Sequence, residues 1–96
     1  MNGLKLNGHL SLRIQVDEKR VRLIIYNNGV EEVCRKEDLH KLIRYISSED
    51  ERLFKGRLQL FKHVGGIGIE VKGKYAGTIK PEYLLNCLRE KQTKAQ

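Results

Sequence analysis

The sequence predicts an α+β fold in which two β-β-β-α units form one antiparallel sheet with both helices packed on one face. Three observations lead to this prediction. Several short segments alternate apolar and polar residues, two segments place apolar residues at helical spacing, and the second half of the chain repeats the order of the first. The 96 residues have room for a single domain, 1–96, with units at about 8–48 and 53–91 and a frayed tail at 91–96.

The first unit opens with the clearest strand of the chain. Residues 10–16 alternate apolar and polar side chains, as in a strand with one buried face. The polar turn 17–20 leads into residues 21–26, the expected antiparallel partner. Asn28-Gly29 then closes a second hairpin, because both residues tolerate the positive φ of a type I′ turn. Residues 30–34 are the expected third strand.

A helix over about 36–47 is expected to complete the first unit. Apolar residues fall at i, i+3, i+4 and i+7 from Leu39, which gives the helix one apolar face. Glu37 and Asp38 lie in its first turn, where the helix dipole favours acids. At the start of the chain, the leucines of residues 4–6 predict an additional edge strand.

The second unit begins after a polar loop at 47–52. Residues 57–61 and 67–72 alternate on either side of the Gly65-Gly66 turn and predict another hairpin. A further tight turn leads into a strand at 75–79.

A second helix is expected over about 81–90, since its proline stands at a first position that tolerates the missing N–H. A shift of 46 positions superimposes apolar residues of the two units, for example Val21 on Ile67 and Leu42 on Leu88. Neither unit is large enough to cover a sheet alone, so we expect the two units to share one core.

The charge of the chain favours a polyanionic partner. The formal net charge is +7 and the isoelectric point is near 9.6. Residues 52–80 hold seven basic residues and one acid, a net charge of +6, whereas residues 31–51 hold four basic residues and seven acids, a net charge of −3. The basic charge is therefore concentrated in the second unit.

The sequence favours a cytoplasmic protein that does not enter a membrane. No apolar run approaches the ~18 residues of a membrane helix, and the first residues show no export signal. In that compartment Cys34 and Cys87 are expected to stay reduced and to act as small core residues.

Residue spacing gives no catalytic or metal site, so we expect neither an enzyme nor a cofactor. His9, His40 and His63 share no metal-ligand spacing with Cys, Asp or Glu and are expected to be solvated or to cap elements. The G-x-S-x-G motif of a nucleophilic serine is absent. The glycine-rich segment 65–68 leads into a strand rather than a helix, so it predicts a hairpin turn with a glycine that relieves crowding.

The polar face of the strands is the candidate binding surface. It combines guanidinium, amide and aromatic groups. The cationic groups can bind phosphates, and the aromatic rings offer flat surfaces on which bases can stack. We therefore predict a protein that binds single-stranded DNA or RNA with little sequence preference, with Tyr26 and Phe61 as stacking platforms. The predicted nucleic-acid-binding residues are Arg13, Arg22, Tyr26, Arg57, Phe61, Lys62, Lys72 and Lys74.

Two strand-rich units that each end in a helix resemble, in layout, the repeats of the PUR and Whirly groups of single-strand binders. The resemblance is one of architecture, and no motif of either group is present. The alternative is a non-enzymatic interaction module, such as a small regulator or inhibitor or a homodimer. In that case Ile24, Tyr26 and Phe61 would bury against a partner protein or a second copy.

Overall fold

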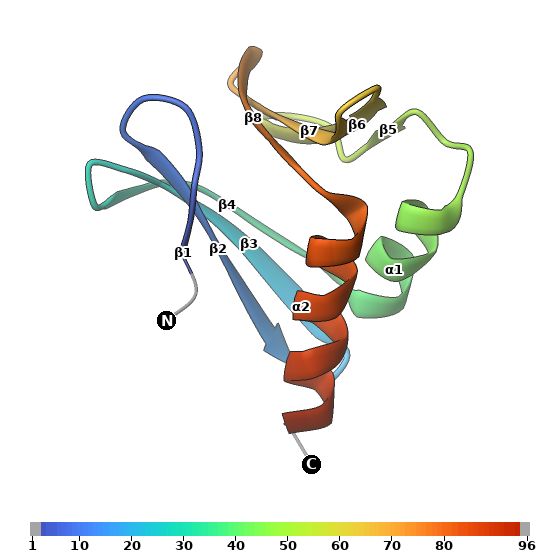
Figure 1. The fold of residues 1–96 in the computed structure, drawn as a ribbon. Helices are drawn as coiled ribbons and strands as arrows, with labels where there is room; N and C mark the ends of the chain where they lie inside the picture. Colours follow the sequence, from blue (N-terminus) through green and yellow to red (C-terminus); the bar gives the residue numbers. More distant parts are fainter. Residues whose placement is uncertain (1–2, 95–96) are drawn as a thin grey trace.

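Two four-stranded antiparallel sheets and two helices make up the fold (Figure 1). The structure is a computed structural model that describes residues 3–94, with side chains through residue 89. Sheet A is followed by α1 (Leu39–Ser47), and its strands are β1 (Gly3–Lys5), β2 (Leu10–Asp17), β3 (Arg20–Asn27) and β4 (Val30–Asp38). Sheet B is followed by α2 (Pro81–Lys94), and its strands are β5 (Arg52–Leu53), β6 (Leu58–His63), β7 (Gly66–Val71) and β8 (Lys74–Ile79).

The α+β class is confirmed, but the prediction of a single sheet with both helices on one face is wrong. Among residues 3–94, each strand pairs only within its own unit, in sequence order. The strand that ends sheet A, β4, carries charged side chains at most of its positions, and such edge strands resist further pairing. Alternation along a strand identifies its two faces but not its neighbours, so it could not distinguish one sheet from two.

Each sheet has a short first strand ahead of the three longer ones. The edge strand expected from residues 4–6 is present as β1, whose Leu4 lies opposite Leu12. The equivalent strand of sheet B, β5, is only two residues long and pairs with β6, in a segment whose sequence indicated only a polar loop.

Both helices differ from the expected ranges at one end. The strand before α1 continues to Asp38, whose carboxylate caps the helix by accepting a hydrogen bond from the backbone N–H of His40 at 3.3 Å. Helix α2 begins at Pro81 as expected and continues to Lys94 rather than ending near residue 90. The last part of the expected frayed tail, 95–96, lies outside the described residues.

The tight turns follow from local sequence. Asn28 and Gly29 have φ angles of 55° and 83°, the left-handed values that a type I′ turn requires. Lys72 and Gly73 repeat this geometry with 53° and 82° between β7 and β8.

One hydrophobic core joins the inner faces of both sheets and both helices. Helix α2 follows sheet B in the sequence but packs against β2 of sheet A and against α1 (Figure 1). Leu42 of α1 and Leu88 of α2 are completely buried, as are Ile25 of sheet A and Ile69 of sheet B. Each sheet therefore depends on residues from both units to cover its apolar face.

The two cysteines are free thiols in different environments. Cys87 packs against the core as expected, whereas Cys34 lies opposite Ile24 on the outer face of sheet A. The prediction that Cys34 is a core residue is thus wrong. Successive side chains of β4 point to opposite faces of the sheet, and the register with β3 places Cys34 on the outer face. No helix within residues 3–94 has both the length and the apolar composition needed to cross a membrane.

Candidate functional site

Three rings gather on the outer face of sheet B. Phe61 and His63 come from β6 and Tyr75 comes from β8, with ring centroids 5.3 to 6.2 Å apart. The side chain of Tyr75 is 52% exposed and His63 is also exposed, while Phe61 is half-buried. These three residues, called the aromatic cluster below, form a continuous and accessible aromatic surface.

A glycine allows the ring of Phe61 to lie close to the sheet. Gly68 on β7 is the register partner of Phe61. A Cβ atom at residue 68 would lie 2.3 Å from Cζ of Phe61, far inside van der Waals contact. The ring thus occupies the space that a side chain on the central strand would fill.

Thr78 links the two outer rings of the aromatic cluster. Its Oγ1 lies 2.9 Å from Nε2 of His63 and also within hydrogen-bonding distance of the Tyr75 hydroxyl. Tyr75 and Thr78 are three residues apart, a spacing that places residues of a regular strand on opposite faces. A β-bulge opposite Ile69 and Glu70 changes the alternation and puts both side chains on the face of Phe61.

Arg52 borders the aromatic cluster on the side of β5. Its guanidinium carbon lies 5.2 Å from the centroid of the Phe61 ring. It donates to both carboxylate oxygens of Glu70 at 3.2 Å and to Oε1 of Gln59 at 3.0 Å. The carboxylate of Glu70 raises the pKa of Arg52 and balances its charge. The polar groups on this side of the rings therefore satisfy one another.

A groove of about 460 Å³ runs between the two sheets beside Tyr75. The β1–β2 connection forms one wall, and the β7–β8 hairpin together with Asn27 of β3 and Glu32 of β4 forms the others. The backbone N–H of Asn7 donates to the carbonyl of Ala76 at 2.7 Å and so joins the β1–β2 connection to β8. Inside the groove, Nζ of Lys72 lies 3.0 Å from the carboxylate of Glu32. Hydrogen bonds from Lys72, and secondly from Asn27, lower the pKa of Glu32.

Lys74 also lines the groove, next to Tyr75. It is exposed, and among the described residues it has no ion-pair partner. Its charge is therefore available to a ligand, unlike that of Lys72.

Apart from Lys62, the nucleic-acid-binding residues predicted for the second unit lie in the aromatic cluster, in the groove and in the loop before β6. Phe61 belongs to the aromatic cluster, and Lys72 and Lys74 belong to the groove. Arg57 is exposed in the loop before β6, and its carbonyl accepts a hydrogen bond from the backbone N–H of Lys72 at 2.7 Å.

Lys62 does not lie on the face of Phe61. Its Nζ donates to the carbonyl of Ser48 and lies 4.6 Å from the centroid of the Tyr45 ring. Tyr45 is buried, and this burial raises its pKa to about 12. Lys62 thus closes the C-terminal end of α1, because period-two alternation points residue 62 away from the side chain of residue 61.

The predicted residues of the first unit lie on the outer face of sheet A. Arg13 is the register partner of Ile24, and Arg22 and Tyr26 flank Ile24 on the same face of β3. Ile24 is only 2% exposed, although it is not part of the central core. The alternative interpretation, in which Ile24 awaits burial against a partner, is therefore wrong for this residue.

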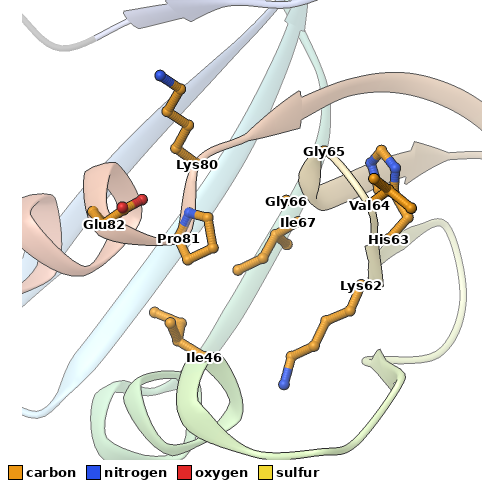
Figure 2. A pocket seen from close by; sticks show the side chains of 10 residues that line it. All are labelled: Ile46, Lys62, His63, Val64, Gly65, Gly66, Ile67, Lys80, Pro81 and Glu82. Atoms are coloured by element: carbon orange, nitrogen blue, oxygen red, sulfur yellow. The ribbon is translucent and has the colours of Figure 1, made fainter.

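The largest hollow of those described, about 620 Å³, lies between the end of α1, the β6–β7 turn and the start of α2 (Figure 2). Its floor is apolar, formed by Ile46, Ile67 and Pro81. Figure 2 shows the amino groups of Lys62 and Lys80 pointing in different directions, away from a common centre. This hollow has no set of polar groups that converges on a ligand.

The sequence interpretation missed most of the aromatic cluster. It assigned His63 a solvated or capping role and did not place Tyr75 on any face. Tyr75 is separated from Phe61 by two turns and a bulge, and no local pattern reports a bulge. The glycine that relieves crowding was expected and is observed at Gly68.

Comparisons with protein-family models, curated proteins and solved structures found no match for this chain. Within the described part of the chain, no group of three or more His, Cys, Asp or Glu side chains is arranged to hold a metal ion. The geometry of the two outer faces is therefore the basis on which a function can be assigned.

Proposed function

We propose that this protein binds single-stranded nucleic acid, DNA or RNA, with low sequence preference, through the aromatic cluster and the adjoining groove. The observation that carries the proposal is the accessible aromatic surface of Phe61, His63 and Tyr75 over Gly68. Every base has a π-face, so aromatic platforms bind single strands with little regard to sequence. Bases in a duplex are already stacked on one another and do not offer those faces.

Charge supports the same ligand. Residues 52–80 carry a net charge of +6, and Lys74, which has no ion-pair partner among the described residues, stands beside Tyr75. A strand that continues from Tyr75 into the groove would bring a phosphate to this ammonium group, because both residues line the groove. Such contacts release counterions from the nucleic acid and make the affinity fall steeply with salt.

Low specificity follows from the hydrogen bonds beside the rings. Arg52, Gln59 and Glu70 bond to one another and leave few free donors or acceptors to read a base edge. We propose binding rather than catalysis for the same reason, because the acid on this face is engaged by an arginine. The cytoplasm, where single-stranded nucleic acid is available, is the location that fits this function.

The test is the affinity for a fluorescently labelled oligothymidine, measured by anisotropy at two salt concentrations. Tyr75→Ala should weaken binding by about fivefold to a hundredfold, the loss expected for one stacked base. The matched control is Tyr83→Ala, which removes another exposed tyrosine (43% exposed) from α2, away from the aromatic cluster.

Two results would contradict the proposal. One is the absence of binding to wild-type protein at low salt. The other is an equal loss of affinity in both tyrosine variants. A stable homodimer in sedimentation experiments that protects Tyr75 would instead support the interaction-module alternative.

A further inference from the structure

A polar hollow of about 410 Å³ lies on the outer face of sheet A, whereas the aromatic cluster lies on sheet B. The residues that line it are Gln15, Asp17, Arg20, Arg22 and Lys36. They come from three neighbouring strands and occupy two adjacent rows of the sheet. Gln15, Arg22 and Lys36 form one row, and Asp17 and Arg20 belong to the next.

The arrangement of charge in this hollow is unfavourable without a ligand. Arg22 and Lys36 are direct register partners, with Cα atoms separated by only the ~4.5–5.5 Å of an antiparallel pair. Like charges in this relation destabilise a sheet. Arg20 adds a third cation and Asp17 a single acid, so the lining side chains carry a net charge of +2.

These cations lack a carboxylate within ion-pair distance among the described residues, although Arg20 stands between Asp17 and Asp38 in the register of the sheet. Arg52, Lys72 and Lys41 each form an ion pair with a glutamate, but Arg20, Arg22 and Lys36 form none among the described residues. Asp17, although it lines the same hollow, lies beyond ion-pair distance of all three.

The guanidinium group of Arg22 has N–H donors that lack a strong acceptor within the described part of the protein. It donates to Oε1 of Gln15 at 3.3 Å and to Sγ of Cys34 at 3.5 Å, and sulfur is a weak acceptor. Its Nε is buried without a hydrogen-bond partner. A ligand with several acceptor oxygens would satisfy groups that the protein leaves unsatisfied.

We infer that this hollow binds a terminal phosphate group. A phosphomonoester carries close to two negative charges and three acceptor oxygens, which suits two guanidinium groups and one ammonium group on adjacent strands. A carboxylate would supply one charge and two oxygens to the same three cations. The inference does not depend on nucleic-acid binding by the aromatic cluster, since the two sites share no residue.

The probe is inorganic pyrophosphate, titrated into the ¹⁵N-labelled protein at constant ionic strength and followed by NMR. We expect saturable amide shifts centred on residues 15, 22 and 36. Lys36→Gln and Arg20→Gln should each weaken binding about tenfold, as expected when a charge-assisted hydrogen bond is lost. Asp17→Asn should tighten binding, because it removes the only acid that lines the hollow.

The matched control is Lys80→Gln, which removes an exposed lysine between β8 and α2 and should leave the pyrophosphate affinity unchanged. Thermal melts of each variant verify folding, and the gain expected for Asp17→Asn cannot arise from misfolding. Shifts that never saturate, or an equal loss in Lys80→Gln and Lys36→Gln, would overturn the inference.

Competition experiments identify the source of the phosphate. Oligothymidines with and without a 5′-phosphate are compared for their ability to displace pyrophosphate. Preferential displacement by the phosphorylated strand assigns the hollow to a strand end. Displacement by neither strand, with saturable pyrophosphate binding retained, assigns it to a small phosphorylated compound. Both results support a terminal-phosphate site on sheet A, whereas equal displacement by both strands would show that internal phosphodiesters bind and would overturn the inference.

Discussion

The two sheets share one strand order and one core, yet the middle rows of their outer faces differ. In sheet A this row crosses Arg13 on β2, Ile24 on β3 and Cys34 on β4. Ile24 fills the centre and is 2% exposed, which indicates that the polar side chains around it cover it. Sheet A thus presents guanidinium groups over an apolar residue.

In sheet B the middle row of the outer face crosses Phe61 on β6, Gly68 on β7 and Thr78 on β8. The centre of this row has no side chain, so the ring of Phe61 covers the backbone of the central strand. His63 and Tyr75 extend the aromatic surface from there.

The difference shows how one residue on a central strand determines which side chains a whole face exposes. In sheet A the branched side chain of Ile24 lies beneath long cationic side chains, whose charge is complementary to an anion. A glycine lets a neighbouring aromatic ring lie flat, which suits a base. The two outer faces therefore expose different chemical groups on sheets with the same strand order.

The largest expected effect tests whether the two units are one cooperative structure. Leu23→Ala removes a fully buried side chain from sheet A and should destabilise the protein by about 2–5 kcal/mol through lost burial and a cavity. Because the core is shared, sheet B should unfold in the same transition. Circular dichroism and NMR signals of His63 and Tyr75 are the measurements, with Leu23→Met as the volume-conserving control. Signals of sheet B that outlast those of sheet A would show that the units are independent.

A smaller effect is expected when the centre of sheet B is made more like that of sheet A. Gly68→Ala places a Cβ atom where the Phe61 ring lies, so the ring must turn away from the sheet. Oligonucleotide affinity should fall about tenfold, within the range for one lost stacking contact, while the melting temperature changes little. Gly3→Ala is the control, since a Cβ at residue 3 meets no atom within 4 Å. Unchanged affinity in Gly68→Ala would remove the role assigned to the glycine.

The smallest effect is expected when a polar side chain that covers Ile24 on sheet A is removed. Arg22→Ala uncovers part of Ile24 and should lower the melting temperature slightly, and less than Leu23→Ala does. It should also leave stacking on the aromatic cluster intact, because Arg22 lies on the other sheet. Melts and oligonucleotide titrations of this variant beside Tyr75→Ala provide the comparison. A loss of affinity as large as that of Tyr75→Ala would mean that both sheets contact the same strand.

Local sequence patterns were sufficient for every element except β5 and for part of the candidate site. Alternation located the longer strands, the spacing from Leu39 located α1, and the positive φ angles of Asn28 and Gly29 follow from their side chains. These features depend on neighbours within a few positions, which a single sequence displays. Phe61 was found for the same reason.

Tertiary structure alone decided the division into two sheets and the composition of the aromatic cluster. Strand pairing depends on competition between edges far apart in the chain, and here the charged β4 ends sheet A while two-residue β5 starts sheet B. The bulge in β8 reverses the face of Tyr75, because one extra residue shifts the period of two. The sequence by itself thus determined what each segment is, and the long-range register determined which side chains meet.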